Sequence, residues 1–198
     1  MGLDLEYINH QTALDDDEKE GLLIKSISTR AELDEFEQQN IERAIAWTMK
    51  KHLKIKDILS EEFVRKLHKK MFDQIWRWAG EYRKTNKNIG VDKFYIGIEI
   101  KNLLDDCKFW VENKSFSEDE IAIRFKHRMV HIHPFPNGNG RHSRLIADVL
   151  IEQGFGRPVF TWGSGQLASQ SNLRKEYLAA LFEADKDNYE PLIKFARK

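Results

Sequence analysis

The chain has very little cysteine, little proline and no long apolar run. Its 198 residues include a single cysteine, Cys107, and four prolines. One cysteine cannot form a disulfide within the chain, which is typical of a protein in the reducing cytoplasm. No apolar stretch approaches the roughly 20 residues of a membrane-spanning helix, and the acidic start "MGLDLEYINHQTALDDDEKEG" lacks the apolar core of a signal peptide. We therefore predict a cytoplasmic protein that does not bind membranes, with Cys107 as a small core residue.

An excess of charge of either sign is also missing. The chain has 32 basic and 32 acidic side chains, so its net charge is zero. A dedicated nucleic-acid-binding protein usually carries a basic excess, so we expect no direct contact with nucleic acid. At this length a single domain is the default expectation.

Apolar residues recur with a helical period along most of the chain. Thr29 and Glu32 have the spacing of a capping box, which predicts a helix that reaches Met49. A second helix is expected from Ser60 through Ile75. Further helices are expected over about 99–113, 117–130, 140–153, 170–185 and 188–197, and residues 1–27 are expected to form an irregular arm.

One region alternates in the way that strands do. The segments "YRKTNKNIGV" and "KFYIGI" carry β-forming residues on either side of a bend at Gly90 and Asp92, which predicts a hairpin. The predicted fold class is therefore all-α, a helical bundle with one small β-hairpin. We divide the chain into residues 1–54, an N-terminal arm and helix that packs on the core, and residues 55–198, the main domain.

The richest motif is "HIHPFPNGNGRHSR", residues 131–144, which opens directly into an amphipathic helix. The first N–H groups of a helix have no helical partner and the helix dipole is positive there, so this turn predicts an anion site. Successive backbone N–H groups at Gly138, Asn139 and Gly140 can surround an anion. Arg141 and Arg144 are three positions apart and can point towards the same anion.

His133 lies beside this predicted anion site. Its ordinary pKa of about 6.5 suits it to accept a proton at neutral pH. Four histidines, at 127, 131, 133 and 142, also raise the alternative of a zinc site, although a His-x-His pair in a turn without cysteine or carboxylate support is a weak zinc signal. A base beside a phosphate-binding turn is what nucleotide-dependent transfer chemistry requires.

The same residues carry a resemblance. "HPFPNGNGRHSR" resembles the signature of the Fic family, His-x-Phe-x-(Asp/Glu)-Gly-Asn-Gly-Arg-x-x-Arg. The segment "IAIRFKHRMVHIHPF" is similar to the helix that leads into the Fic loop, "GEYRKTNKNIGVDKFYI" to the family's hairpin flap, and "YLAALFEADKDNYEPLIKF" to its closing helices. The resemblance covers roughly residues 55–198, and the whole pattern is most similar to the bacterial subgroup called mobile mystery protein B.

The resemblance implies a protein adenylyltransferase, which moves AMP from ATP to a Tyr, Ser or Thr hydroxyl of a target protein. His133 would be the catalytic base. The nucleotide would be held by Gly138, Asn139, Gly140, Arg141 and Arg144, and the flap would dock the target through Asn88, Ile89, Gly90 and Val91. The Doc-like kinase branch has Ala-Asn-Lys-Arg where this chain keeps Gly-Asn-Gly-Arg, and Gly140 leaves room for the β- and γ-phosphates.

Asn137 departs from the family signature, which has an acid there to hold Mg²⁺. An amide oxygen is a neutral and weaker ligand for this hard cation, so we expect Mg²⁺ to be held weakly and the enzyme to be slow. One alternative is a nucleotide-binding regulator or toxin–antitoxin partner with weakened catalysis. Others are removal of AMP and transfer of another phosphate-containing group. Assembly of the chain into a homo-oligomer is a further alternative.

The N-terminal helix offers two candidates for an inhibitory glutamate. Fic proteins are often held inactive by a helix with (Ser/Thr)-x-x-x-Glu-(Gly/Asn), whose glutamate pairs with the second arginine of the motif. Ser28 and Glu32 fit the spacing, but Glu32 already has a capping role. Glu37 lies in mid-helix, where it is either an ordinary solvated residue or a partner of Arg144. If neither glutamate inhibits, control would come from an antitoxin-like or helix-turn-helix partner protein, or there would be no such control.

Overall fold

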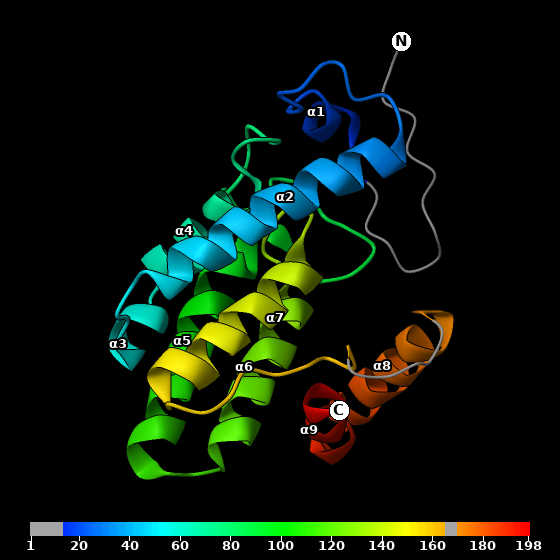
Figure 1. Cartoon of the computed structure of the whole chain (residues 1–198). Helices are drawn as coiled ribbons and strands as arrows, with labels where there is room; N and C mark the ends of the chain where they lie inside the picture. Colours follow the sequence, from blue (N-terminus) through cyan, green and yellow to red (C-terminus); the bar gives the residue numbers. More distant parts are fainter. Residues whose placement is uncertain (1–13, 165–169) are drawn as a thin grey trace.

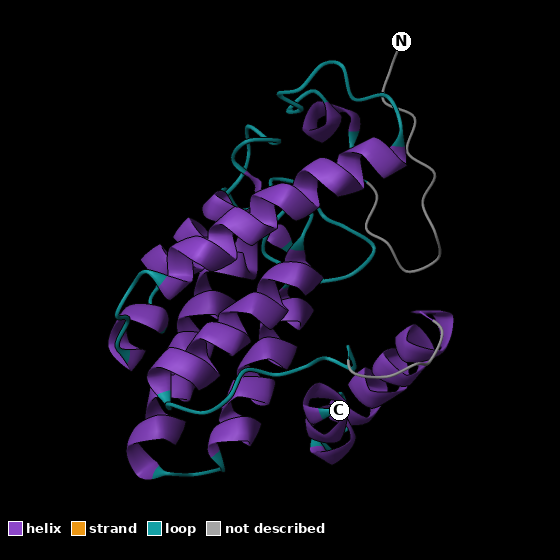
Figure 2. Ribbon diagram, viewed as in Figure 1, coloured by secondary structure: helices purple, strands orange, loops and turns teal. Residues whose placement is uncertain are grey.

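The computed structural model describes residues 14–164 and 170–198, and this part of the chain is a bundle of helices joined by loops (Figures 1 and 2). No strand occurs among these described residues, and the one isolated β-bridge joins Leu22 to Trp76. The elements are α1 (Asp16–Lys19), α2 (Arg30–Met49), α3 (Ile55–Ile58), α4 (Glu61–Phe72), a 3-10 turn (Lys93–Tyr95), α5 (Ile96–Asn113), α6 (Glu118–Ile132), α7 (Asn139–Val149), a π turn (Leu150–Gly154), α8 (Gln170–Ala184) and α9 (Glu190–Arg197). The predicted all-α class is confirmed.

Local sequence signals account for the start of the long α2 helix. The Thr29 side chain accepts a hydrogen bond from the N–H of Glu32, and the Glu32 carboxylate accepts one from the N–H of Thr29, so the predicted capping box is confirmed. The helix packs along α4 and buries Leu33, Ile41 and Ala44 in the common core. Figure 1 shows α2 lying in front of α4 and running along it.

Helix α6 lies between α5 and α7 and positions the motif. Ser117 caps its N-terminus by accepting from the N–H of Glu120. Its inner face is buried almost completely at Ala122, Phe125 and Met129. The π turn at Leu150–Gly154 continues α7, and Leu150 and Ile151 are fully buried there. Because both helices beside the motif are anchored in the core, the loop between them has fixed ends.

The predicted β-hairpin is wrong in its secondary structure. Residues 81–92 form a loop without strand ladders, and residues 93–98, expected as the second strand, form the 3-10 turn and the first turn of α5. The Asp92 side chain caps this turn by accepting from the N–H of Phe94. Side-chain capping and packing of Ile96 and Ile100 therefore override the alternating pattern.

Smaller differences concern helix lengths. Helix α4 ends at Phe72 rather than continuing through Ile75, and α1 and α3 were not anticipated. Residues 1–13 of the predicted arm lie outside the described residues.

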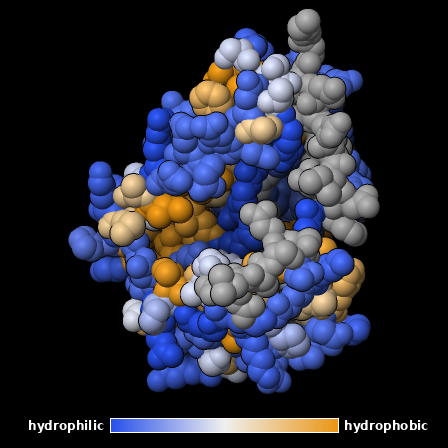
Figure 3. Space-filling view, turned by 45° about the vertical axis from the view of Figure 1, so that its right-hand side comes forward, coloured by the Kyte–Doolittle hydropathy of each residue, from blue (hydrophilic) through white to orange (hydrophobic). Residues whose placement is uncertain are grey.

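Cys107 is fully buried on α5, as predicted, and burial raises the pKa of its thiol to about 12. No helix in the described part of the chain is long and apolar enough to cross a membrane. The face in Figure 3 is mostly hydrophilic and is hollowed near its centre.

Candidate active site at the α6–α7 loop

His133 ends helix α6 and begins the loop. It adopts a left-handed backbone conformation with φ 54°, and its N–H donates to the carbonyl of Met129 at 3.3 Å. Its side chain is 5% exposed. Burial lowers its pKa to about 4; a hydrogen bond with the Val130 backbone opposes this shift, and the positive charges of Arg83 and Lys87 reinforce it. The imidazole is therefore neutral at pH 7 and has a lone pair that can accept a proton, and its lowered pKa makes it a weaker base than an exposed histidine.

Two side chains of the motif hold the loop closed. Phe135 is fully buried and stacks on the His68 ring with 3.7 Å between centroids. The Asn139 amide accepts from the N–H of Phe135 at 2.9 Å and donates to its carbonyl at 2.8 Å. The side chain of Asn139 is thus committed to the loop itself. Any contact of this residue with a nucleotide is left to its backbone N–H.

Gly138 and Gly140 differ in what surrounds them. Gly138 caps α7 with φ 76°, and a Cβ there would lie 2.5 Å from Cζ of Phe72. It therefore needs both the left-handed conformation and the absence of a side chain. Nothing lies within 4 Å of the position that a Cβ on Gly140 would take. This open space at the N-terminus of α7 agrees with the predicted place for phosphates.

Asn137 is fixed through its backbone as well as its side chain. His68 donates from Nε2 to the Asn137 carbonyl at 3.0 Å and accepts at Nδ1 from the N–H of Gly80 at 2.9 Å. The Asn137 Oδ1 atom lies 2.6 Å from the N–H of Gly138, which donates to it. Among the described residues no group of three or more His, Cys, Asp or Glu side chains is placed to hold a metal ion. A cation at this loop would find one neutral amide oxygen here.

The two arginines of the motif do not converge, contrary to expectation. Arg141 forms an ion pair with Glu37 of α2, with 2.6 Å between its Nη1 and Oε2. Arg144 instead lies over the ring of Tyr177 on α8, 5.8 Å from the centroid. Side chains three positions apart on a helix diverge readily when each has its own partner. A shared anion would require at least Arg141 to leave its carboxylate.

Glu37 was expected to be either solvated or a partner of Arg144, and both expectations are wrong. It is 2% exposed, pairs with Arg141, and accepts from Nε1 of Trp76 at 2.6 Å. Glu32 is exposed and lies at the start of α2, where its carboxylate accepts from the N–H groups of Ser28 and Thr29. Of the two candidate inhibitory residues, the structure places only Glu37 at the motif.

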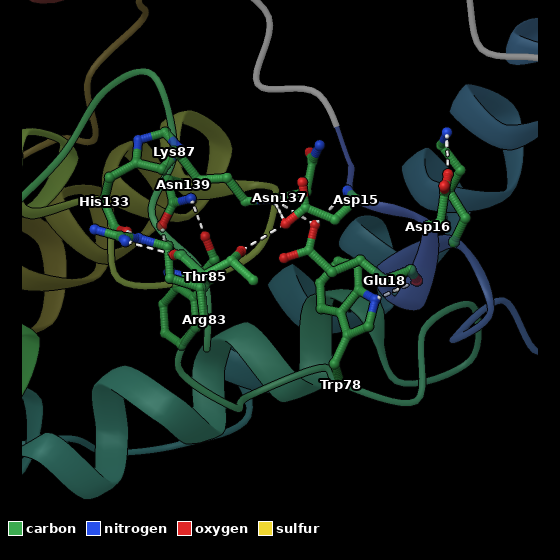
Figure 4. A network of polar contacts seen from close by, with 12 residues as sticks. Asp15, Asp16, Glu18, Trp78, Arg83, Thr85, Lys87, His133, Asn137 and Asn139 are labelled. Atoms are coloured by element: carbon green, nitrogen blue, oxygen red, sulfur yellow. Dashed lines mark hydrogen bonds and ion pairs between the residues drawn. The ribbon is translucent and has the colours of Figure 1, made fainter. Parts of the chain in front are cut away.

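The predicted flap residues Asn88, Ile89, Gly90 and Val91 lie in a segment that we call the docking loop, residues 81–92. The N–H of Val91 donates to the carbonyl of Ile132 at 3.3 Å. A Cβ on Gly90 would lie 2.6 Å from the Cβ of His133. Figure 4 shows the side chains of this loop reaching from the motif to the α1 region. The docking loop therefore lies directly against His133.

Sequence reasoning missed His68, Trp76 and Arg83. His68 and Trp76 fall on the helical period of the apolar residues around them, so their positions read as core, and their polar atoms gave no separate signal. Arg83 is followed by Lys84 and Lys87, and nothing in the pattern separates it from these lysines. Only the fold shows that Arg83 is 3% exposed and Lys84 is not buried.

The geometry agrees with a family comparison. A model of the Fic/DOC family matches residues 58–151. These residues form a Fic/DOC domain. A protein adenylyltransferase Fic from Aedes aegypti is 27% identical over 120 residues, which cover 59% of this chain and 22% of that protein. The chain thus matches less than a quarter of the length of this relative.

Solved Fic structures share the fold. The BepC protein of Bartonella tribocorum, a VirB-translocated effector with bound AMPPNP, has a TM-score of 0.66 at 16% identity and covers 92% of this chain and 97% of that chain. The N-terminal Fic domain of a putative cell filamentation protein from Bartonella quintana, with bound ADP, has a TM-score of 0.65 at 19% identity, over 87% of this chain and 86% of that chain. These likenesses establish the Fic architecture of the described residues.

Proposed function

We propose that this chain is a protein adenylyltransferase that transfers AMP from ATP to a Tyr, Ser or Thr hydroxyl of a target protein. The observation that carries the proposal is a buried, neutral His133 placed immediately before a glycine loop that opens at Gly140. The Aedes aegypti relative is named for this activity, and the two Bartonella structures hold adenine nucleotides. We also place the chain in the mobile mystery protein B subgroup, on its whole-chain pattern.

The proposed reaction is an in-line displacement. The imidazole of His133 accepts the proton of the target hydroxyl, whose oxygen forms a bond to the α-phosphorus of ATP. The bond from the α-phosphorus to the bridging oxygen breaks, and pyrophosphate leaves. The backbone N–H groups at the start of α7 and the two motif arginines hold the phosphates, so positioning and electrostatics supply most of the rate.

Magnesium fits this site only as an ion carried mainly by the phosphates of the nucleotide. Asn137 offers one amide oxygen, which already accepts from the N–H of Gly138. When bound, the ion would neutralise phosphate charge. This weak ligand also favours a second candidate function, a nucleotide-binding regulator or toxin–antitoxin partner that has lost most of its catalysis.

Regulation is proposed to come from α2. Glu37 forms an ion pair with the guanidinium of Arg141, which we expect to bind the phosphates of the nucleotide. While this ion pair is present, Glu37 would compete with the phosphates for Arg141. An antitoxin-like partner protein could act by stabilising or breaking this ion pair.

Incubating the protein with ATP labelled at the α-phosphate and a bacterial lysate tests the proposal. Wild-type protein should label at least one lysate protein with a mass increase of one AMP, detected by intact-mass measurement. His133→Ala should abolish labelling while ATP binding, measured by calorimetry, stays within about twofold, because it removes a proton acceptor and no phosphate contact.

His131→Ala is the matched control, since His131 is exposed two positions earlier at the end of α6. It should label at the wild-type rate. Equal labelling by His133→Ala would contradict the proposed base. ATP binding without labelling by the wild type or by Glu37→Gln would favour the regulatory alternative.

A further inference from the structure

The guanidinium of Arg83 joins the docking loop to the backbone of the predicted base. Its Nε donates to the carbonyl of His133 at 2.7 Å, and its Nη1 donates to the carbonyl of Thr85 at 2.8 Å. Its Nη2 donates to the carbonyl of Val91. The side chain is 3% exposed. One buried fork therefore holds three carbonyls, that of His133 in the motif and those of Thr85 and Val91 in the docking loop.

Backbone contacts reinforce this junction. The N–H of Arg83 donates to the carbonyl of Pro134 at 2.9 Å, and the N–H of Val91 donates to that of Ile132 at 3.3 Å. Three successive carbonyls, at 132, 133 and 134, are thus held by the docking loop. Gly90 has φ 99°, and a Cβ there would lie 3.1 Å from Nη2 of Arg83 and 2.6 Å from the Cβ of His133. The two segments meet without room for a methyl group.

His133 needs this support because it lies at a helix end. Its φ of 54° is a conformation that residues other than glycine seldom adopt. Its carbonyl follows the last turn of α6, so a bond from outside the helix must satisfy it. Arg83 provides that bond from a side chain with five donors in a rigid plane.

We propose that Arg83 is a positioning residue for nucleotidyl transfer. Arg83 holds the left-handed backbone at His133 and the docking loop in a fixed position relative to each other. The imidazole then faces the hydroxyl of the target that the loop binds. This inference rests on the proposed function and adds to it a residue that touches neither nucleotide nor target hydroxyl.

The charges around His133 allow position and electrostatics to be separated. Two cations face the imidazole, both from the docking loop: Arg83 and Lys87. Lys87 is itself paired with Asp15 at 2.9 Å and Glu18 at 2.5 Å. Burial is the main reason for the low pKa of His133, and the charge of Arg83 adds to it. A lysine at position 83 keeps that charge, but its donors all sit on one nitrogen, so it lacks the planar fork whose three nitrogens each reach a different carbonyl.

Three variants test the proposal: Arg83→Lys, Arg83→Gln and the control Arg77→Gln. Arg77 is exposed in the turn after α4, outside the docking loop, and its loss removes the same charge and side chain. Folding is checked by circular dichroism and thermal melting. The transfer rate is measured from pH 4 to pH 9 with α-labelled ATP and lysate protein, a range that reaches the low pKa of His133. Protonation of His133 is followed separately by NMR of histidine-labelled protein, with the signal assigned by its loss in His133→Gln.

Arg83→Lys should lower kcat at least tenfold while the KM for ATP and the pKa of His133 stay near wild type. Arg83→Gln should lower kcat as much and also raise the pKa of His133, so that the acid limb of the rate moves to higher pH. Arg77→Gln should change neither quantity. If Arg83→Gln does not fold, Arg83→Lys alone decides the matter.

A folded Arg83→Lys that transfers at the wild-type rate would overturn the proposal. So would an Arg83→Gln protein with unchanged rate and unchanged His133 titration. If the wild type transfers nothing, the proposed function fails independently. In that case the NMR spectrum still decides whether Arg83 holds His133: a changed chemical shift of the His133 imidazole in Arg83→Lys, at an unchanged pKa, supports the structural link, and an unchanged chemical shift refutes it.

Discussion

Asparagine occupies two positions of the α6–α7 loop, and the two side chains have different roles. Asn139 bonds both backbone groups of Phe135, so it holds the loop shut. Asn137 stands where the Fic signature has an acid, and its oxygen accepts from the N–H of Gly138. A carboxylate can replace the acceptor at 137 without loss of that bond. At 139 it cannot replace the donor to the Phe135 carbonyl.

Asn137→Asp is therefore expected to raise Mg²⁺ affinity by roughly tenfold and to increase transfer, because it supplies one anionic oxygen to a hard dication. The measurement is the transfer rate as a function of Mg²⁺ concentration. An unchanged or lower rate would show that position 137 does not serve the metal. Asn139→Asp is the contrasting variant and should lower the free energy of unfolding by about 1–3 kcal/mol, since it leaves a buried carbonyl without its donor.

At the scale of elements, the docking loop and the motif form a single unit. The loop has no strand ladder in the described structure, and its shape depends on Arg83, on the cap at Asp92 and on the glycine at position 90. The position of this loop depends on side-chain hydrogen bonds and on the close contact of Gly90 with His133, so one added methyl group can displace it. Its contribution to activity can therefore be tested without touching the motif.

Gly90→Ala should reduce transfer by at least tenfold, because its methyl group would meet the Cβ of His133 at 2.6 Å and strain a φ of 99°. The kinetic assay with α-labelled ATP measures this loss. Gly97→Ala is the matched control: Gly97 lies on α5 and nothing is within 4 Å of its Cβ position. It should keep activity and raise the free energy of unfolding by about 0.5–1 kcal/mol through helix propensity. Normal activity of Gly90→Ala would show that the loop can move away from His133.

Helix α2 brings a buried carboxylate to the motif from far away in the sequence. Removing it by Glu37→Gln should free Arg141 for phosphate and increase ATP-dependent labelling by an order of magnitude, which corresponds to about 1.4 kcal/mol. ATP affinity by calorimetry should increase in parallel. Glu35→Gln, at an exposed position on the same helix, is the control and should label as the wild type does. Equal labelling by all three proteins would mean that control does not pass through α2.

At the scale of the whole molecule, buried titratable groups make stability depend on pH. Burial lowers the pKa of His133 and of His142 to about 4 and lowers that of His68. These groups bind protons more readily in the unfolded chain, where the pKa is about 6.5, so stability falls as the pH drops from 7 towards 4. Burial raises the pKa of Asp148 to about 7, against the hydrogen bond from Trp162. Because an unfolded aspartate has a pKa near 3.9, this group acts in the opposite direction over the same range.

The histidines outnumber the single aspartate, so the free energy of unfolding should be lower at pH 5 than at pH 7.5. Urea denaturation at the two pH values measures it. Asp148→Asn removes the opposing group, and its loss of stability between pH 7.5 and pH 5 should be larger than that of the wild type. A smaller loss in this variant would contradict the raised pKa of Asp148.

The sequence alone predicted the helices whose signals are local. The capping box at Thr29 and the apolar periods of α5, α6 and α7 act within a few residues, and the structure has these helices. The motif itself could be recognised because its glycines, its arginines and His133 lie within twelve consecutive residues, 133–144. For the same reason the transition from α6 through the loop into α7 was predicted near its observed position.

The tertiary structure decided which distant residues meet the motif. Periodicity can mark Glu37 and His68 as helical, but only the packing of α2 and α4 brings them to Arg141 and Asn137. The hairpin was mispredicted because alternation is a weak signal that packing of Ile96 and the Asp92 cap can override. Arg83 could not be distinguished from its lysine neighbours, because burial and a planar set of donors matter only once three carbonyls converge on them. The sequence determined the local helices and the chemistry of the loop; the fold determined the partners of that loop, since those contacts join residues far apart in the chain.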